Sequence, residues 1–137
     1  MYSPKGKIKK KMEELKMKEY TGFFKTMEAQ SRAGEEFPSG AGYAHRAWWK
    51  SKLQGSDTFE CEDLPFENDL PDFVNTLKAA GVTRFAVTDR STALMESMHC
   101  LANLGCSLEG LGKVTRTEER YGETETYTLP AVIFTLS

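Results

Sequence analysis

The segment of residues 81–106, GVTRFAVTDRSTALMESMHCLANLGC, constrains the fold of this chain more than any other. It begins with polar and apolar residues in alternation, as in a half-buried strand with Phe85 and Val87 on one face. A turn follows, in which Thr88 or Asp89 is placed to cap a helix that Gly105 ends. The apolar stripe of this helix is predicted to consist of Leu94, Met95, Met98, Leu101 and Ala102. Strand, helix and strand in this order predict a domain that combines helices with a β-sheet.

Further strands are predicted on both sides of this segment. Residues 58–61 are typical of a short strand, and residues 108–117 and 123–129 alternate Thr with Glu around a turn at 120–122, as in a solvated hairpin. Pro130 cannot donate a ladder hydrogen bond, which predicts a bulge or an edge, and the apolar run 131–136 predicts a central strand. If the strands before and after the helix of residues 94–104 are parallel neighbours, their connection is a right-handed crossover.

Three helices are predicted upstream of this unit. They cover residues 4–33, 43–53 and 70–80, the last with Asp69 as its cap, Leu70, Phe73, Val74 and Leu77 as its apolar stripe and Gly81 as its stop. Residues 34–42, GEEFPSGAG, have the composition of a linker. The prediction is therefore an α+β fold: a helical region over 1–56, then a domain over 57–137 with a mixed sheet of three to four strands and helices mainly on one face, the two forming one compact unit.

The length and composition of the chain favour a folded globular protein. Its 137 residues are the size of one domain, with 39% hydrophobic and 28% charged residues. No run approaches the ~18 apolar residues that a membrane span requires, and the lysine-rich start lacks the apolar core of a secretory signal. The odd number of cysteines (Cys61, Cys100, Cys106) has no framework spacing. We therefore expect a cytoplasmic protein without a membrane partner.

The net charge of −2 conceals a division of the chain. Residues 1–50 carry eleven Lys and Arg against six Glu, whereas residues 51–137 carry seven against fourteen acidic residues. Lys7, Lys9, Lys10 and Lys11 lie in the basic part and are candidates for contacts with nucleic-acid phosphates. Since all four of these residues are Lys and base readout favours Arg, Asn and Gln, sequence-specific readout of bases is not expected. The alternative is a solvated helix face.

No catalytic constellation is recognisable, and we predict no catalytic residues, no cofactor and no metal site. A Walker-type phosphate loop and the C-x-x-C and H-x-x-x-H patterns are all absent from the sequence. The two histidines, His45 and His99, fall on different predicted helices. A zinc site that combines them with the cysteines is the weaker alternative, because Cys100 and Cys106 are more simply small core residues.

The turn at residues 88–92 is a candidate anion site. Arg90, Ser91 and Thr92 follow a strand and open a predicted helix, where free backbone N–H groups favour anions. Asp89 opposes this role, since its carboxylate accepts hydrogen bonds from the same N–H groups when it acts as an ordinary cap.

A second candidate is the aromatic cluster in the helix of residues 43–53. Neighbouring tryptophans cannot both face the same interior, so either Trp48 or Trp49 is expected to be partly exposed. Trp and Arg are the residue types that anchor protein interfaces. The predicted partner-binding residues are Tyr43, Arg46, Trp48 and Trp49. The alternative is that Trp48 joins the core and Trp49 packs beneath the glycine-rich linker.

The phrases AVTDRSTALMESM, LANLG and EGL, within residues of about 66–117, resemble small uncharacterised proteins of conjugative and other mobile elements in gut bacteria. That family has no assigned activity, so the resemblance implies a setting and transfers no functional residue. It implies an accessory protein of a mobile element, such as an inhibitor of a host factor.

These observations favour a non-enzymatic protein-interaction or regulatory module. The competing class is a nucleic-acid-binding accessory protein that uses the lysine-rich helix, and a small enzyme or metal-binding protein is the weakest candidate. Because the apolar stripe of the first helix (Ile8, Met12, Leu15) needs cover, docking of that helix or a homo-oligomer is also expected.

Overall fold

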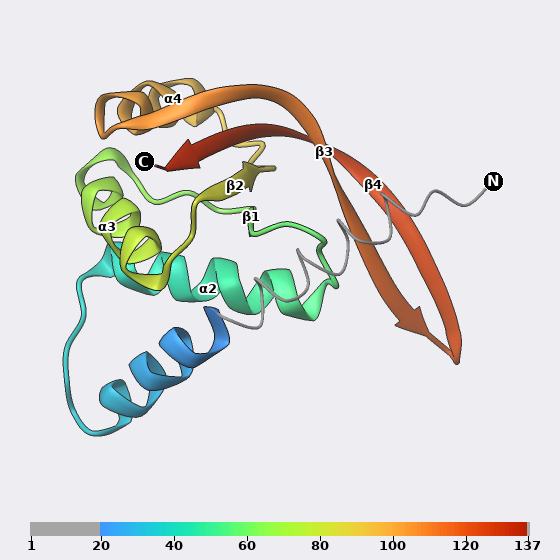
Figure 1. Cartoon of the computed structure of the whole chain (residues 1–137), viewed down its shortest axis with the longest axis horizontal. Coiled ribbons are helices and arrows are strands. Elements are labelled where there is room, and N and C mark those ends of the chain that lie inside the picture. Colours follow the sequence, from blue (N-terminus) through green and yellow to red (C-terminus); the bar gives the residue numbers. More distant parts are fainter. Residues whose placement is uncertain (1–19, 137) are drawn as a thin grey trace.

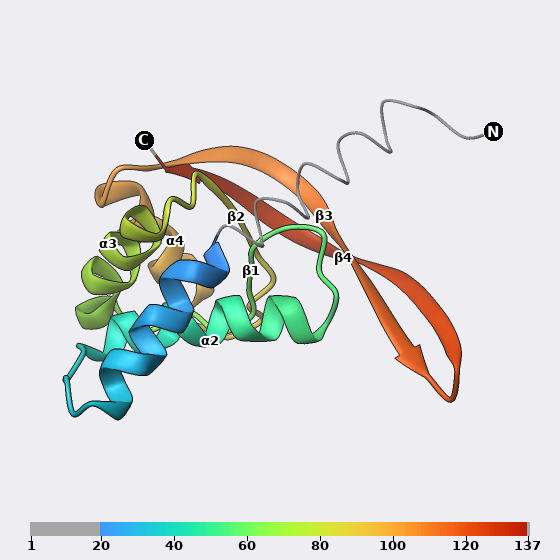
Figure 2. The ribbon, with the colours of Figure 1, turned by 60° about the horizontal axis from the view of Figure 1, so that its bottom comes forward.

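The computed structural model describes residues 20–136, which form a mixed β-sheet with helices packed on one face (Figures 1 and 2). Residues 20–32 are helical. The helices that follow are α2 (Ser39–Leu53), the short 3-10 helix η1 (Glu67–Asp69), α3 (Leu70–Ala80) and α4 (Leu94–Asn103). The strands are β1 (Glu60–Cys61), β2 (Arg84–Val87), β3 (Cys106–Arg120) and β4 (Glu123–Leu136). The predicted α+β class is confirmed.

The strand order is β1-β2-β4-β3, so the condition attached to the predicted crossover, that the strands on either side of α4 are neighbours, is not met. β1 and β2 are parallel, but β4 lies between β2 and β3 and is antiparallel to both. The strands before and after α4 are therefore not neighbours. The physical reason is that β4 is apolar on both faces, with Phe134 turned to one and Ile133 to the other, so it takes the central position where both faces are covered.

The main core lies between the helices and the sheet. It takes Phe24 from the helix of residues 20–32, Trp48 from α2, Phe73 from α3, and Phe85 and Phe134 from the sheet, all with at most 1% of their surface exposed. The rings of Phe85 and Phe134 stack at 5.7 Å between centroids across the β2–β4 pair. The predicted stripe of α3 is fully buried, and this helix ends at Gly81 as expected.

α2 begins earlier than predicted and absorbs part of the expected linker. Gly40 and Gly42 lie inside this helix rather than in a loop. A Cβ atom at Gly40 would stand 2.2 Å from the backbone oxygen of Asp69 and 2.6 Å from the backbone nitrogen of Phe73. Gly40 is thus required because the beginnings of α2 and α3 approach each other closely.

α4 differs from its prediction at its start and on its outer side. It begins at Leu94, several residues after Asp89, and Asp89 does not cap it. Leu101 is buried and Leu94 and Met98 pack against the core, but Met95 is 72% exposed and Ala102 is also exposed. The predicted five-residue stripe is too wide, because α4 covers only the margin of the sheet.

β3 and β4 form a long hairpin whose tip projects beyond the helices in both views (Figures 1 and 2). The turn at Tyr121 and Gly122 has positive φ at both positions, as the type I′ two-residue hairpin turn requires. Pro130 pairs opposite Lys113 in a stretch of β4 that β2 does not reach, so it lies at a local edge as predicted. The bulge itself lies between Leu108 and Gly110.

The sheet curls until its two ends are joined by a short segment. Ser56 pairs with Arg116 on the outer edge of β3, and the Asp57 N–H donates to the Thr115 carbonyl at 2.9 Å. Only a few residues later the chain enters β1 at the opposite end of the sheet. The sheet face opposite the helices is therefore partly enclosed, and it holds a second small apolar cluster of Ala86, Val114, Ala131 and Ile133.

Candidate functional site

The outward face of α2 carries a row of exposed side chains at helical spacing. Arg46 is exposed, Trp49 is 51% exposed and Leu53 is 67% exposed, at positions i, i+3 and i+7. The Arg46 guanidinium lies 5.6 Å from the ring centroid of half-buried Tyr43, which orders the cation beside the row. We call Arg46, Trp49 and Leu53 the α2 face. A row of this spacing is what an amphipathic helix presents to an apolar groove.

Trp48 does not belong to this face, although the sequence placed it among the partner-binding residues. Its side chain is fully buried and stacks on Phe24 at 5.2 Å between ring centroids. Its indole Nε1 has no hydrogen-bond partner in the described part of the chain. The tryptophan pair is thus divided, because successive helical positions point about 100° apart: Trp48 packs in the core and Trp49 stays half exposed.

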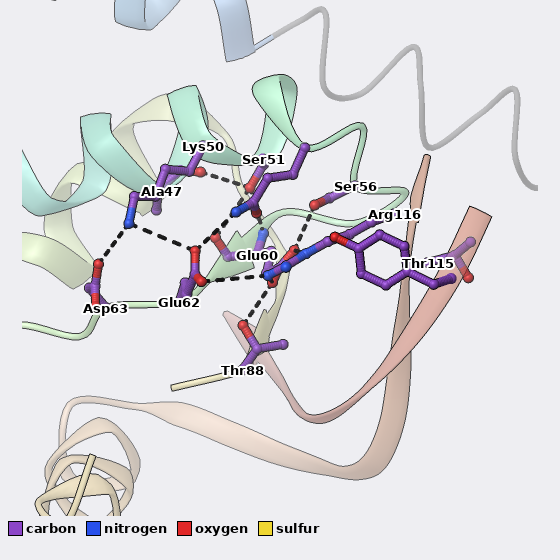
Figure 3. A network of polar contacts seen from close by, with 12 residues as sticks. Ala47, Lys50, Ser51, Ser56, Glu60, Glu62, Asp63, Thr88, Thr115 and Arg116 are labelled. Atoms are coloured by element: carbon purple, nitrogen blue, oxygen red, sulfur yellow. Dashed lines mark hydrogen bonds and ion pairs between the residues drawn. The ribbon is translucent and has the colours of Figure 1, made fainter. Parts of the chain in front are cut away.

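A buried ion pair between Glu60 of β1 and Arg116 of β3 crosses the enclosed face of the sheet (Figure 3). Glu60 is 2% exposed and Arg116 8% exposed. Both carboxylate oxygens accept from the guanidinium, in a bidentate contact with 3.1 Å between Nε and Oε2. The Ser56 hydroxyl donates to Oε2 at 2.6 Å and the Thr88 hydroxyl to Oε1 at 2.8 Å.

The electrostatics of the pair favour both charged forms. Burial alone would raise the pKa of the Glu60 carboxyl, but the hydrogen bonds from Arg116, Ser56 and Thr88 together lower it below its ordinary value. The hydrogen bond with Glu60 in turn raises the pKa of Arg116. Each carboxylate oxygen of Glu60 already accepts two hydrogen bonds, so this carboxylate is not free to accept a proton from a substrate. Its role is structural, because it connects the two ends of the sheet.

One amide donor of the predicted anion site, the Ser91 N–H, is directed at Asp89. The Asp89 carboxylate accepts from the Ser91 N–H at 2.7 Å and from the Leu64 N–H at 2.9 Å. Because α4 begins at Leu94, the N–H groups of its first turn do not lie at the predicted turn. Arg90, Ser91 and Thr92 are exposed. Arg90 and Ser91 line a hollow of about 510 Å³ with Arg116, but three carboxylates line it too: Glu62, Asp63 and Asp89.

A larger groove of about 820 Å³ separates the helix of residues 20–32 from the start of α2. On its wall His45 Nε2 lies 2.8 Å from Glu28 Oε1. The hydrogen bond from His45 lowers the pKa of the Glu28 carboxyl. His45 is thereby paired within the first two described helices, and His99 is exposed on α4. Among residues 20–136 no group of three or more His, Cys, Asp or Glu side chains is placed to hold a metal ion.

The cysteines behave as small apolar residues. Cys61 and Cys106 are buried in the main core, and Cys100 packs against it. Burial raises the pKa of all three thiols, so the reactive thiolate form is disfavoured. The candidate nucleic-acid residues Lys7, Lys9, Lys10 and Lys11 lie outside the described residues.

The Glu60–Arg116 pair was missed in the sequence, although a signal for it exists. β3 alternates, so the spacing of two residues places Arg116 on the same face as buried Val114. A charged residue at a buried position needs a partner of opposite charge. The sequence does not say which of the many carboxylates that partner is, because the choice depends on the curl of the sheet.

These observations define a small α+β protein with a curled four-stranded sheet, a buried ion pair that closes it and an exposed aromatic helix face. The chain belongs to a family described as a domain of unknown function (DUF7698), whose model matches residues 43–136. The matched region begins at Tyr43, within α2, and therefore includes the α2 face and all four strands. Comparisons with curated proteins and with solved structures find no match. Within residues 20–136 no helix combines the length and apolar character that crossing a bilayer demands.

Proposed function

We propose that this protein is a non-enzymatic interaction module that binds a protein partner through the α2 face. The observation that carries the proposal is the exposure of Trp49 and Leu53, one and two turns beyond exposed Arg46 on the same helix. Large apolar side chains in a row on a helix are costly to leave in water, and Trp and Arg are the most frequent hot-spot residues of interfaces.

The side chains of the α2 face indicate what kind of surface the partner presents. Two apolar side chains require an apolar groove, and Arg46 requires a carboxylate at one end of that groove. Lys50 does not add to this charge, because it is paired with Asp63 at 3.0 Å and lies 3.7 Å from Glu62. We therefore propose a partner surface with an apolar groove and one acidic rim. The cysteines without a framework spacing support the cytoplasm as the proposed setting. The resemblance of residues of about 66–117 supports the role of an accessory protein of a mobile element.

The test is affinity purification of the full chain from its native host, with quantitative mass spectrometry of the recovered proteins. We expect a protein that the wild type and Phe66→Ala recover, but that Trp49→Ala and Arg46→Ala do not. Phe66 is the matched control, since it is 76% exposed and lies outside α2. Equal recovery by all four chains would contradict the proposed face.

The charge division of the chain supports nucleic-acid binding as the second candidate. A gel shift with random DNA should then weaken steeply with salt and disappear when Lys7, Lys9, Lys10 and Lys11 are changed to Glu. Absence of binding at low salt would dispose of this candidate.

A further inference from the structure

β3 is an edge strand, and part of its outer side is unpaired and carries exposed leucines. Between residues 106 and 113 it pairs only with β4, and no other described strand lies along its free side. Leu108 is 59% exposed and Leu111 is 90% exposed. An edge of this kind is a template for another strand.

Both leucines lie on the side of the sheet that the helices cover elsewhere. Leu108 pairs opposite Phe134 and Leu111 opposite Val132, and both of these β4 residues belong to the main core or pack against it. α4 contacts β3, but the helix layer leaves this stretch of the edge strand uncovered. Leu108 and Leu111, which face the core side of the sheet, are therefore exposed to water on its edge strand.

We propose that this edge pairs with β3 of a second copy, antiparallel and about a two-fold axis, so that two four-stranded sheets become one of eight strands. The bulge between Leu108 and Gly110 keeps Leu108 and Leu111 on the same side of the strand. With the two bulges opposite each other, each Leu108 lies beside the Leu111 of the second copy. The same patch then meets itself, as a two-fold interface requires.

The charges of the edge are compatible with a second copy. Between residues 106 and 113 the only charged side chains are Glu109 and Lys113, whose formal charges cancel. Glu109 is already paired within its own chain, with 2.9 Å between its Oε2 and the Nε of Arg84. The acidic part of the hairpin, residues 118–125, lies beyond this stretch. In an antiparallel pair these acidic ends point away from each other.

The first test is the mass of the full chain in solution, measured by sedimentation over a range of protein concentrations. We expect a reversible dimer whose dissociation constant rises about tenfold or more in Leu111→Lys. The matched control is Leu53→Lys, because Leu53 is also an exposed leucine but lies on α2; it should leave the dimer intact. Thermal unfolding of diluted monomer verifies that Leu111→Lys folds. A wild type that stays monomeric, or a dimer that Leu111→Lys leaves unchanged, would overturn the proposal.

The second test is the register. Chains carrying Leu108→Cys and chains carrying Leu111→Cys are mixed and oxidised, and we expect the mixed disulfide to exceed either symmetric product. A predominance of Leu111→Cys homodimers would overturn the bulge-to-bulge register. The wild-type chain is oxidised in parallel as the control for the native cysteines, because Cys61 and Cys106 are buried but Cys100 is partly exposed.

Discussion

Glu60 and Arg116 belong to strands at opposite ends of the sheet, yet their side chains form a bidentate ion pair on its enclosed face. Ser51 of α2 helps to hold Glu60 in place from outside the sheet, since its hydroxyl accepts a hydrogen bond from the Glu60 N–H at 2.9 Å. The pair therefore links the curl of the sheet to the helix that carries the proposed binding face (Figure 3).

Replacement of Glu60 by Gln should remove a large part of the stability. Breaking a buried ion pair leaves an uncompensated charge and costs about 3–5 kcal/mol, so we expect a loss of about 3 kcal/mol in the free energy of unfolding by urea at pH 7. Glu125→Gln, on the exposed hairpin, should change it little. In the double variant Glu60→Met with Arg116→Met, much of the loss should be recovered. A single variant as stable as the wild type would contradict the role of the pair.

The same pair predicts how stability depends on pH. Because the pKa of Glu60 is lower in the folded chain than in the unfolded chain, its contribution is present above the unfolded value, about 4.3, and is lost as the pH falls through the lower folded value. Unfolding free energies measured from pH 7 down to pH 3 should therefore fall less steeply in Glu60→Gln than in Glu125→Gln. Identical slopes would show that Glu60 has no shifted pKa.

The close approach of α2 and α3 predicts opposite effects for two glycines of one helix. Gly40→Ala should destabilise the chain by about 2 kcal/mol or more, because its Cβ meets backbone atoms that cannot turn away. Gly42→Ala meets nothing within 4 Å and should be neutral or stabilising by up to about 1 kcal/mol. Thermal or urea unfolding measures both. Equal effects of the two substitutions would mean that the helices do not meet at Gly40.

The two tryptophans should behave differently in unfolding experiments. Trp48→Ala should cost about 3–5 kcal/mol, as for a large core side chain, whereas Trp49→Ala should cost about 0.5 kcal/mol or less. In acrylamide quenching, Trp49→Phe leaves only the buried indole and should be protected, and Trp48→Phe should be quenched strongly. Comparable quenching of both variants would contradict the division of the pair.

The local elements were largely predictable from the sequence, and their assembly was not. The stripe of α3, the strand 84–87 and the turn at Tyr121 and Gly122 follow from residue spacing and turn chemistry, which act over a few residues. The insertion of β4 between β2 and β3 depends on which strand buries the most apolar surface when both of its faces are covered. That requires a comparison of segments that lie far apart in the sequence. Gly40 likewise reads as a linker residue in the sequence, because a close contact between two helices leaves no local signal.

The candidate site was predictable only where it depends on neighbouring residues of one helix. Adjacent tryptophans on a helix must diverge, so one exposed indole was expected, but which one faces the core depends on Phe24 across the helix pair. The exposure of Leu53 extends the predicted site by one turn. The position of Asp89 predicts that it competes with an anion for backbone donors, and its carboxylate accepts hydrogen bonds from the Ser91 and Leu64 N–H groups.

The most direct test of the proposed function is the affinity of the purified chain for the purified partner, measured by titration calorimetry with the wild type, Trp49→Ala and Phe66→Ala. We predict that Trp49→Ala raises the dissociation constant by about tenfold or more, equivalent to about 1.4 kcal/mol, while Phe66→Ala binds as the wild type does. Equal affinity of Trp49→Ala and the wild type, with both chains folded, would contradict the α2 face as the binding surface.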